Sequence, residues 1–280
     1  MITKSKATIT SQTGPLAVTV FDNIEAKKVL VIASATGVKQ EFYKKFALFL
    51  AEHKITVLTF DYAGIGQSLT TSIKVLKHNA ADWGNKDLES IFQYVKKNFA
   101  AYEKYVLGHS IGGQLLGMAP SIVDFNKIIL IASQSGYWRY WKGFGQVKMW
   151  FNWYVLFPAL LNSFGYLPSK KVSGMEDLPK NVANQWRNWG KHKKYIFSEL
   201  NHSSSLYSRL RLPVTAVSID DDEFAPKGAA DWMAAQYSTA NKKFMHLIPK
   251  DFDTHKIGHF GLFKSKFQNS VWKILVKEVV

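Results

Sequence analysis

The stretch Gly108-His-Ser-Ile-Gly112 decides the fold of this chain. Its spacing, G-x-S-x-G, places a serine on a strained turn between a strand and a helix, where small neighbours are needed because the backbone packs closely. The apolar run Tyr105–Leu107 predicts the strand before this turn, and Ile111–Met118 predicts the helix after it. Because the spacing alone would occur by chance in roughly one chain in ten of this length, the flanking pattern is what gives it weight. Together they predict that Ser110 is a nucleophile raised at the end of a strand.

Strands and helices are predicted to alternate along the rest of the chain. Continuous apolar runs are typical of strands buried on both faces, and apolar residues spaced three and four apart are typical of amphipathic helices. The predicted fold is therefore α/β, with a mainly parallel central sheet covered by helices on both faces. The expected elements are a hairpin of Thr8–Ser11 and Ala17–Phe21, strands Val29–Ile32, Ile55–Phe60, Lys127–Ala132, Val214–Ile219 and Phe244–Ile248, and helices 41–52, 87–99, 229–237 and 263–276.

One segment is too long to be a plain connection between strands. Residues 134–212 span about eighty positions, whereas a whole βαβ unit needs about thirty. The segment contains six of the nine tryptophans, and its twelve Lys/Arg against three acids supply +9 of the net charge of +15. We therefore expect residues 1–133 and 213–280 to form the core, and residues 134–212 to form an aromatic-rich lid over the carboxyl edge of the sheet.

An acidic partner for the serine is expected between the serine and the histidine in chain order, at the carboxyl end of a strand. Asp220-Asp221-Asp222 follows the predicted strand Val214–Ile219 and meets both conditions. The residues alone leave the choice among the three carboxylates open.

Three histidines follow these carboxylates in the chain. His246 lies inside a strand pattern, which favours a structural role, and His255 lies in the loop that follows. His259 lies in Ile257-Gly-His-Phe-Gly261, a glycine-flanked loop before the last helix, from which an imidazole can reach back to the serine. This context favours His259 as the base.

Motifs along nearly the whole chain resemble the α/β-hydrolase superfamily, and more narrowly a bacterial group of predicted serine α/β-hydrolases of unassigned substrate. The resemblance implies the fold and a Ser-His-Asp triad. It rests on Ala35-Thr-Gly-Val38, Gln40-Glu-Phe-Tyr43, Asp61-Tyr-Ala-Gly-Ile-Gly66 with Ser68, Gly108-His-Ser-Ile-Gly-Gly-Gln114, Ala132-Ser-Gln-Ser-Gly-Tyr-Trp138 and Gly258-His-Phe-Gly261.

The resemblance also narrows the choice of site residues. The acid of the superfamily commonly stands four residues before a proline, as Asp222 does before Pro226. The glycine–histidine pair favours His259 over His255. For the oxyanion hole the resemblance implies the backbone amides of Val38 and Ile111, although Thr36-Gly37 replaces the usual His-Gly of that loop.

The predicted function is that of a serine hydrolase with a small-molecule acyl substrate. Ser110 would attack an acyl carbonyl, His259 would take its proton and Asp222 would orient the imidazole. The aromatic lid favours an ester or thioester with a hydrophobic part. Two alternatives remain: a serine peptidase or amidase, and a non-catalytic binding module at anionic membranes. No metal or organic cofactor is implied.

The uncharged run Met149–Leu167 has the length of a membrane span. Asn152 is costly in lipid, Pro158 is expected to break a helix, and a single span would separate Ser110 from His259. We therefore expect no span.

Composition narrows the remaining classes of function. Cysteine is absent, which excludes disulfides, thiolate catalysis and cysteine-bound metals. The first residues lack the apolar stretch of a signal peptide, so a cytoplasmic location is expected. A net charge of +15 permits peripheral contact with an anionic membrane, but no nucleic-acid-binding motif accompanies it, and no oligomeric state is predicted.

Overall fold

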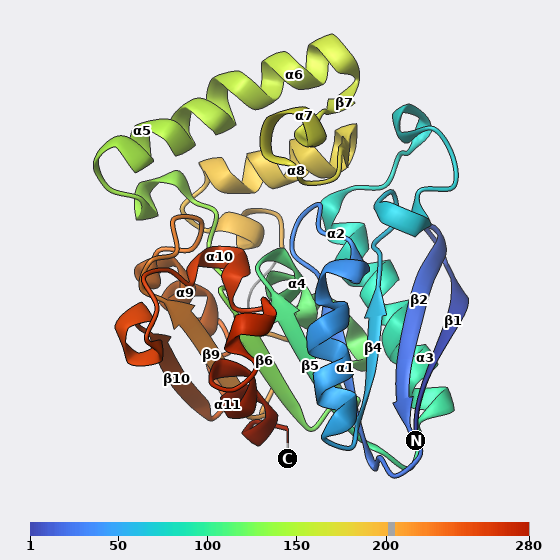
Figure 1. The fold of residues 1–280 in the computed structure, drawn as a ribbon. Coiled ribbons are helices and arrows are strands. Elements are labelled where there is room, and N and C mark those ends of the chain that lie inside the picture. Colours follow the sequence, from blue (N-terminus) through green and yellow to red (C-terminus); the bar gives the residue numbers. More distant parts are fainter. Residues whose placement is uncertain (201–204, 280) are drawn as a thin grey trace.

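A single large sheet lies at the centre of the computed structural model, which describes residues 1–200 and 205–279; within those residues the sheet has eight strands (Figure 1). Their order is β1-β2-β4-β3-β5-β6-β9-β10. The strands from β4 to β10 in that order run parallel, whereas β2 is antiparallel to β4 and β1 to β2. The bounds are β1 (Ile2–Ser11), β2 (Gly14–Asn23), β3 (Lys28–Ala33), β4 (Ile55–Phe60), β5 (Glu103–His109), β6 (Lys127–Ile131), β9 (Val214–Ile219) and β10 (Lys242–Leu247).

The sequence pattern explains this sheet well. The predicted hairpin is β1 and β2, and the central strands are apolar because both faces are covered: every residue of β4 is buried. The predicted α/β fold with a mainly parallel sheet is confirmed.

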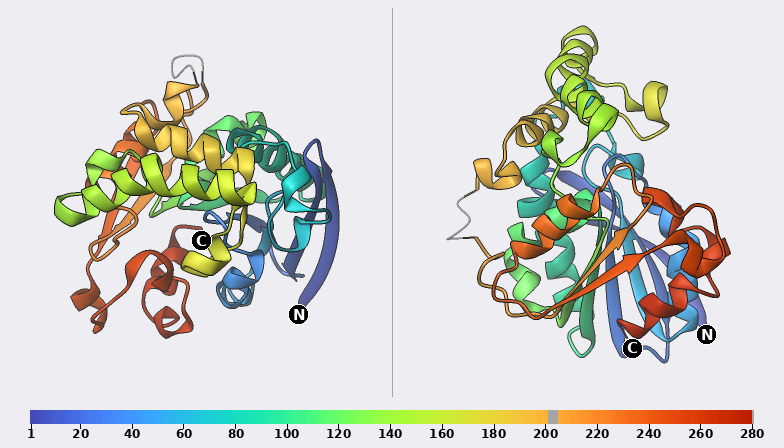
Figure 2. Two further views of the ribbon diagram at one scale, coloured as in Figure 1. Left: turned by 90° about the horizontal axis from the view of Figure 1, so that it is seen from above. Right: turned by 90° about the vertical axis from the view of Figure 1, so that its left-hand side faces the viewer.

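Helices cover both faces of the sheet (Figure 2). On one face, Phe46 of α1 and Trp272 of α11 belong to one buried apolar cluster. On the other face, Phe92 of α3 and Met233 of α9 belong to a second cluster. The helices of the core are α1 (Lys44–Glu52), α2 (Ala80–Asp82), α3 (Glu89–Asn98), α4 (Ile111–Gln114), α9 (Lys227–Ala235), α10 (Gly258–Gly261) and α11 (Val271–Lys277).

Two predicted helices are shorter than expected. The helix expected over 111–118 is α4 followed by a separate 3-10 turn, Leu116–Met118, because two of the four residues of α4 are glycines, which disfavour a long helix. The helix expected over 263–276 begins only at Val271, after the polar stretch Gln268-Asn-Ser270, whose residue types favour turns and caps.

The chain between β6 and β9 contains a group of helices that lies above the carboxyl edge of the sheet (Figure 1). The helices α5 and α6 follow one another along a common line, and α8 lies beneath them. Two short strands of this group, β7 and β8, pair antiparallel on either side of α7. The bounds are α5 (Gly143–Phe151), α6 (Phe157–Phe164), β7 (Tyr166–Leu167), α7 (Ser169–Ser173), β8 (Leu178–Pro179) and α8 (Lys180–Lys191).

Pro158 does not end the helix that contains it. Helical backbone continues from α5 to α6 through a π-helical turn, Asn152–Leu156, and Pro158 follows in the first turn of α6. There its missing amide costs little, because the π turn has already interrupted the regular hydrogen-bond pattern. No helix among the described residues is long and apolar enough to cross a membrane.

The last part of the same segment packs with the core of the molecule. Tyr195, Ile196 and Tyr207 have no exposed surface and belong to the cluster that contains α3 and α9. Leu161 of α6 and Trp189 of α8 belong to the same cluster. Figure 1 shows α5 to α8 standing over the sheet edge, and we call residues 134–191 the cap.

Candidate active site

Ser110 lies on the turn between β5 and α4 with the backbone angles φ +54° and ψ −121°. A residue other than glycine rarely adopts a positive φ, so this turn is strained. The turn needs its glycines: a Cβ on Gly108 would lie 2.3 Å from Cα of Gly113, and a Cβ on Gly112 would lie 2.2 Å from the carbonyl oxygen of Ala33. The tight turn therefore raises the Ser110 side chain at the carboxyl edge of the sheet.

His259 and Asp222 form a buried hydrogen-bonded pair. Nδ1 of His259 lies 2.8 Å from Oδ2 of Asp222, and their side chains are 4% and 0% exposed. The other oxygen of Asp222 accepts hydrogen bonds from the amides of Phe224 and Ala225 at 2.8 and 3.0 Å. Because the carboxylate only accepts, Nδ1 of His259 is the donor, and Nε2 keeps the lone pair that a base requires.

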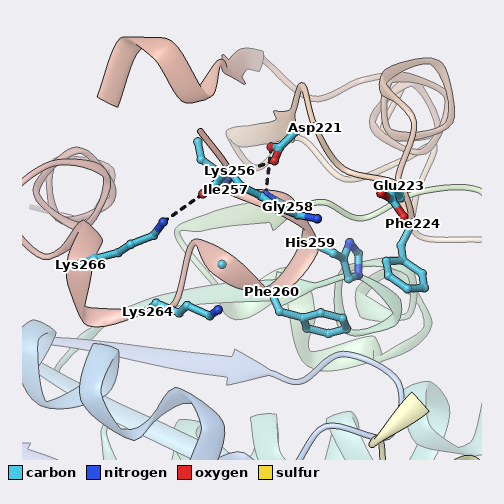
Figure 3. Close-up of a pocket in the computed structure, with 11 residues that line it drawn as sticks. Asp221, Glu223, Phe224, Lys256, Ile257, Gly258, His259, Phe260, Lys264 and Lys266 are labelled. Atoms are coloured by element: carbon cyan, nitrogen blue, oxygen red, sulfur yellow. Dashed lines mark hydrogen bonds between the residues drawn. The ribbon is translucent and has the colours of Figure 1, made fainter. Parts of the chain in front are cut away.

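The two neighbouring carboxylates have different partners. Asp221 accepts hydrogen bonds from the amides of Ile257 and Gly258 at 3.0 and 2.9 Å, and so fixes the loop that carries His259 (Figure 3). Asp220 lies 3.3 Å from Nε2 of His246. Of the three adjacent acids, Asp222 is the one that contacts His259.

Gln134, at the start of the cap, contacts the Ser110 hydroxyl. In the part of the chain that the structure describes, Oγ of Ser110 donates to Oε1 of Gln134 at 3.5 Å and makes no hydrogen bond to His259. Gln114 donates to the same oxygen at 3.1 Å, and Gln134 in turn donates to the carbonyl of Phe224 at 3.1 Å. The hydroxyl must therefore exchange partners before His259 can accept its proton. Sequence reasoning did not identify Gln134, which gives no signal beyond its place after β6.

The loop after β3 lies beside Ser110, because the carbonyls of Ala33 and Ser34 pack against Gly112. The amide of Ile111, at the first position of α4, has no backbone acceptor among the described residues. The amide of Val38 instead donates to the carbonyl of Ala35 at 3.1 Å. Of the two amides predicted for the oxyanion hole, that of Val38 therefore already has a hydrogen-bond acceptor, whereas that of Ile111 has no backbone acceptor among the described residues.

The cap contacts this loop directly. The amide of Glu176 donates to the carbonyl of Gly37 at 2.7 Å, and the Glu176 carboxylate lies 3.4 Å from Lys39 and 2.9 Å from Lys170. The loop predicted to supply an oxyanion donor is therefore fixed partly by the cap.

His109, the first variable residue of the G-x-S-x-G motif, is a second buried histidine of the site, and sequence reasoning missed it. It is completely buried, and the centre of its ring lies 4.8 Å from that of His259. Burial, with a smaller effect of His259, holds the pKa of His109 well below its ordinary value, so the ring is neutral. Its position directly before the nucleophile was the only available signal.

An apolar cavity of about 460 Å³ opens inside the cap. Gln134, which contacts Ser110, and Phe224, whose ring centre lies 5.5 Å from that of His259, form part of its wall. The cavity therefore adjoins the Ser110–His259 region. Most of the wall consists of aromatic and aliphatic side chains of the cap, among them Trp141, Met149, Trp153, Leu156, Phe157, Leu160 and Trp186.

A second, more polar cavity of about 310 Å³ lies on the other side of the histidine loop. Figure 3 shows the rings of Phe224 and Phe260 beside that of His259, with Lys256 and Lys264 around the opening. His259 thus borders this cavity, Gln134 borders the apolar cavity, and Phe224 lines both.

Comparisons with known proteins identify the family and the fold. A family model described as serine aminopeptidase, S33, matches residues 24–250. No curated protein has a matching sequence.

Similar solved structures are α/β hydrolases of low sequence identity. A soluble variant of monoglyceride lipase from Saccharomyces cerevisiae has a TM-score of 0.73 at 11% identity, covering 100% of this chain and 95% of that one. Est1E from Butyrivibrio proteoclasticus, with ferulic acid bound, has a TM-score of 0.64 at 15% identity, covering 98% and 99%. A serine hydrolase from Xanthomonas campestris described as having no lid has a TM-score of 0.55 at 14% identity, covering 99% and 95%. At these identities the likeness shows the fold, whereas the family model spans most of the chain, and the protein therefore belongs to the serine aminopeptidase S33 family of α/β hydrolases.

Proposed function

We propose that this protein hydrolyses an ester or thioester with a hydrophobic part, with Ser110 as nucleophile, His259 as general base and Asp222 as the acid that orients it. The buried hydrogen bond from Nδ1 of His259 to Asp222 is the observation that supports this assignment best, because it fixes the tautomer in which Nε2 can accept a proton.

The proposed reaction has two halves. Oγ of Ser110 attacks the acyl carbon while its proton passes to Nε2 of His259, which then gives that proton to the departing alcohol or thiol. Water attacks the acyl-enzyme, His259 takes the water proton and returns it to Ser110, and the acid leaves. The amides of Ile111 and Val38 are the proposed oxyanion donors, and the Val38 amide must share or release its bond to Ala35.

The apolar cavity of the cap supports a hydrophobic substrate. Its volume of about 460 Å³ is within the range of small-molecule sites, and its aromatic wall favours an acyl chain or an apolar alcohol. We propose that the cap acts as a lid that holds this part of the substrate beside Ser110.

A peptidase is the second candidate, and the description of the family model favours it. Recognition of a free amino terminus calls for a carboxylate near the scissile bond. The described residues along the apolar cavity include no Asp or Glu, and the one charged side chain among them is Lys148. This composition supports an apolar group in that cavity, whereas the carboxylates that an amino terminus would need, Asp221 and Glu223, line the polar cavity beside His259.

Contact with an anionic membrane is a separate proposal, compatible with catalysis or with binding alone. The outer side of α5 and the π turn exposes apolar side chains: Phe144 is 83% exposed, and Val147, Trp150 and Phe151 are 59%, 42% and 45% exposed. Lys142 and Lys148 lie on the same stretch. Aromatic side chains next to cations suit the headgroup layer of a membrane.

Two measurements on the purified protein test the proposed function. We expect hydrolysis of p-nitrophenyl esters with a preference for medium or long acyl chains, little cleavage of aminoacyl p-nitroanilides, and labelling of Ser110 by a fluorophosphonate. Ser110→Ala should abolish both turnover and labelling, whereas Ser72→Ala, at an exposed serine with no capping bond, should change neither. A folded protein whose label maps elsewhere would remove Ser110 as the nucleophile, and faster cleavage of the anilides would favour the peptidase.

A further inference from the structure

A chain of three hydrogen bonds joins the loop after β3, the nucleophile turn and the histidine loop. The amide of Ala35 lies 3.0 Å from the Tyr43 hydroxyl, which lies 2.8 Å from Nδ1 of His109. Nε2 of His109 lies 3.0 Å from the carbonyl oxygen of His259. Tyr43 and His109 are completely buried, so water does not compete for these bonds.

Chemistry fixes the direction of every bond in this chain. A carbonyl only accepts, so Nε2 of His109 carries the proton and donates it to the carbonyl of His259. The ring is neutral, so Nδ1 has a lone pair and accepts from the Tyr43 hydroxyl. Burial raises the pKa of Tyr43, which therefore keeps its proton for this bond, while its oxygen accepts from the Ala35 amide. Each donor in this series of hydrogen bonds thus faces an acceptor.

We propose that His109 and Tyr43 are positioning residues that hold the backbone of the histidine loop and of the predicted oxyanion loop in register with Ser110. The inference rests on the proposed function, since it assigns a role in that reaction. His109 is the residue next to the nucleophile and its ring is bonded to the carbonyl of His259, so it links the backbone of Ser110 to that of His259. Of the three hydrogen bonds, the one from His109 to the His259 carbonyl is the bond that positions the proposed base.

The competing explanation is that His109 and Tyr43 only fill space in the hydrophobic core. The ring of His109 also packs against Phe263, with centres 4.9 Å apart, and Tyr43 packs against the same ring at 4.8 Å. A filler would tolerate any side chain of similar size, and its loss would lower stability without a specific effect on kcat. A positioning residue requires the donor at Nε2, so the two roles differ in which substitutions they tolerate.

Glutamine and asparagine separate the two ends of the imidazole. Glutamine places its amide where Nε2 lies and can still donate to His259, whereas asparagine reaches only the position of Nδ1 and can pair only with Tyr43. The experiment measures kcat, KM, the rate of fluorophosphonate labelling and the melting temperature of the full chain for His109→Gln, His109→Asn and Tyr43→Phe. His78→Asn is the matched control, because Nε2 of His78 makes a bond of the same length, 3.0 Å, to the carbonyl of Ala63.

We expect His109→Gln to keep kcat within about three-fold of wild type, and His109→Asn to lower it about 10- to 100-fold with KM little changed, since displacement of a catalytic group by about 1 Å costs up to about 100-fold. Tyr43→Phe should lower kcat about ten-fold by the same mechanism. Labelling rates should follow the same order. His78→Asn should lower the melting temperature and leave kcat unchanged.

The outcomes distinguish this inference from the proposed function. Equal kcat in His109→Gln and His109→Asn, with wild-type turnover present, would overturn the positioning role and leave the proposed function standing. If His109→Asn does not fold, Tyr43→Phe decides, and wild-type kcat in that variant would likewise overturn the inference. A wild-type protein with neither turnover nor labelling would remove the proposed function, and the positioning role with it.

Discussion

Nδ1 of His259 and Oδ2 of Asp222 lie 2.8 Å apart, and both side chains are buried. Asparagine at position 222 could keep the bonds from the amides of Phe224 and Ala225, but it would present an amide donor to Nδ1 and favour the wrong imidazole tautomer. We therefore expect Asp222→Asn to remain folded and to lower kcat by about 10²- to 10⁴-fold. The measurement is kcat on an ester that the wild type cleaves.

The two adjacent aspartates provide the control for this prediction. Asp220→Asn should have little effect, because Asp220 contacts His246. Asp221→Asn should have an intermediate effect, since its carboxylate holds the amides of Ile257 and Gly258 in the histidine loop. A larger loss in either neighbour than in Asp222→Asn would mean that the orienting acid is assigned wrongly.

Chain-length preference should depend on the apolar cavity of the cap. Leu160 contributes to its wall, and Leu160→Trp would fill part of the space. We expect kcat/KM for long-chain esters to fall by about 10- to 100-fold while that for acetate esters changes little, because apolar contacts in such a pocket contribute about 1–3 kcal/mol. Val147→Trp, at an exposed position of α5, is the matched control. An equal loss for short and long chains would show that the acyl chain binds elsewhere.

The carboxylate of Glu278 should make stability depend on pH. Burial alone would raise its pKa, but hydrogen bonds from Lys127, Lys243 and Thr215 outweigh this and lower the pKa from an ordinary 4.5 to about 2. A pKa that is lower in the folded state stabilises the fold above the unfolded pKa, and that contribution is lost as the pH falls from 4.5 towards 2. Glu278→Gln should therefore lower the free energy of unfolding at pH 7 by about 1–2 kcal/mol, because solvent screens the share of the partly exposed Lys243.

Urea unfolding of wild type and Glu278→Gln across this pH range checks the sign. The difference between the two should shrink steadily below pH 4.5. Glu41→Gln, which removes an exposed ion pair with Lys44, should leave the midpoint nearly unchanged. A difference that stays constant with pH would mean that the effect is not electrostatic.

The exposed side of α5 should bind anionic vesicles at low salt and release them at high salt. Each cation near a charged membrane surface contributes about 1 kcal/mol, and salt screens that attraction. Lys170 of the cap is already paired with Glu176. We therefore expect Lys142 and Lys148 to contribute more than Lys170 to binding the anionic surface. Vesicle sedimentation of wild type and Phe144→Ser/Trp150→Ser measures the apolar contribution. Val123→Ser, at an exposed valine before β6, is the control. Equal binding of the double variant, or binding to neutral vesicles alone, would contradict the proposal.

Local pattern and chain order were enough to predict the sheet and the turn at Ser110, whereas the choice of Asp222, which lies beside His259, needed the resemblance to a known family. These features follow from short stretches whose chemistry is visible in the sequence, such as the glycines that a tight turn needs. The partners of Gln134 and His109 were not predictable, because each contact joins residues brought together only by packing. The turn bond of the Val38 amide to Ala35 was missed for a different reason, because a backbone donor has no side chain to signal its state.

The hydrogen bond from the Glu176 amide to the Gly37 carbonyl ties the cap to the loop after β3, in addition to the two covalent connections of the cap to the core. Swapping in the cap of another hydrolase would therefore do more than exchange a binding pocket. Unless the donor chain supplies a backbone amide at the place of Glu176, the transplant would release the loop at Gly37, and a change intended for specificity would also change turnover.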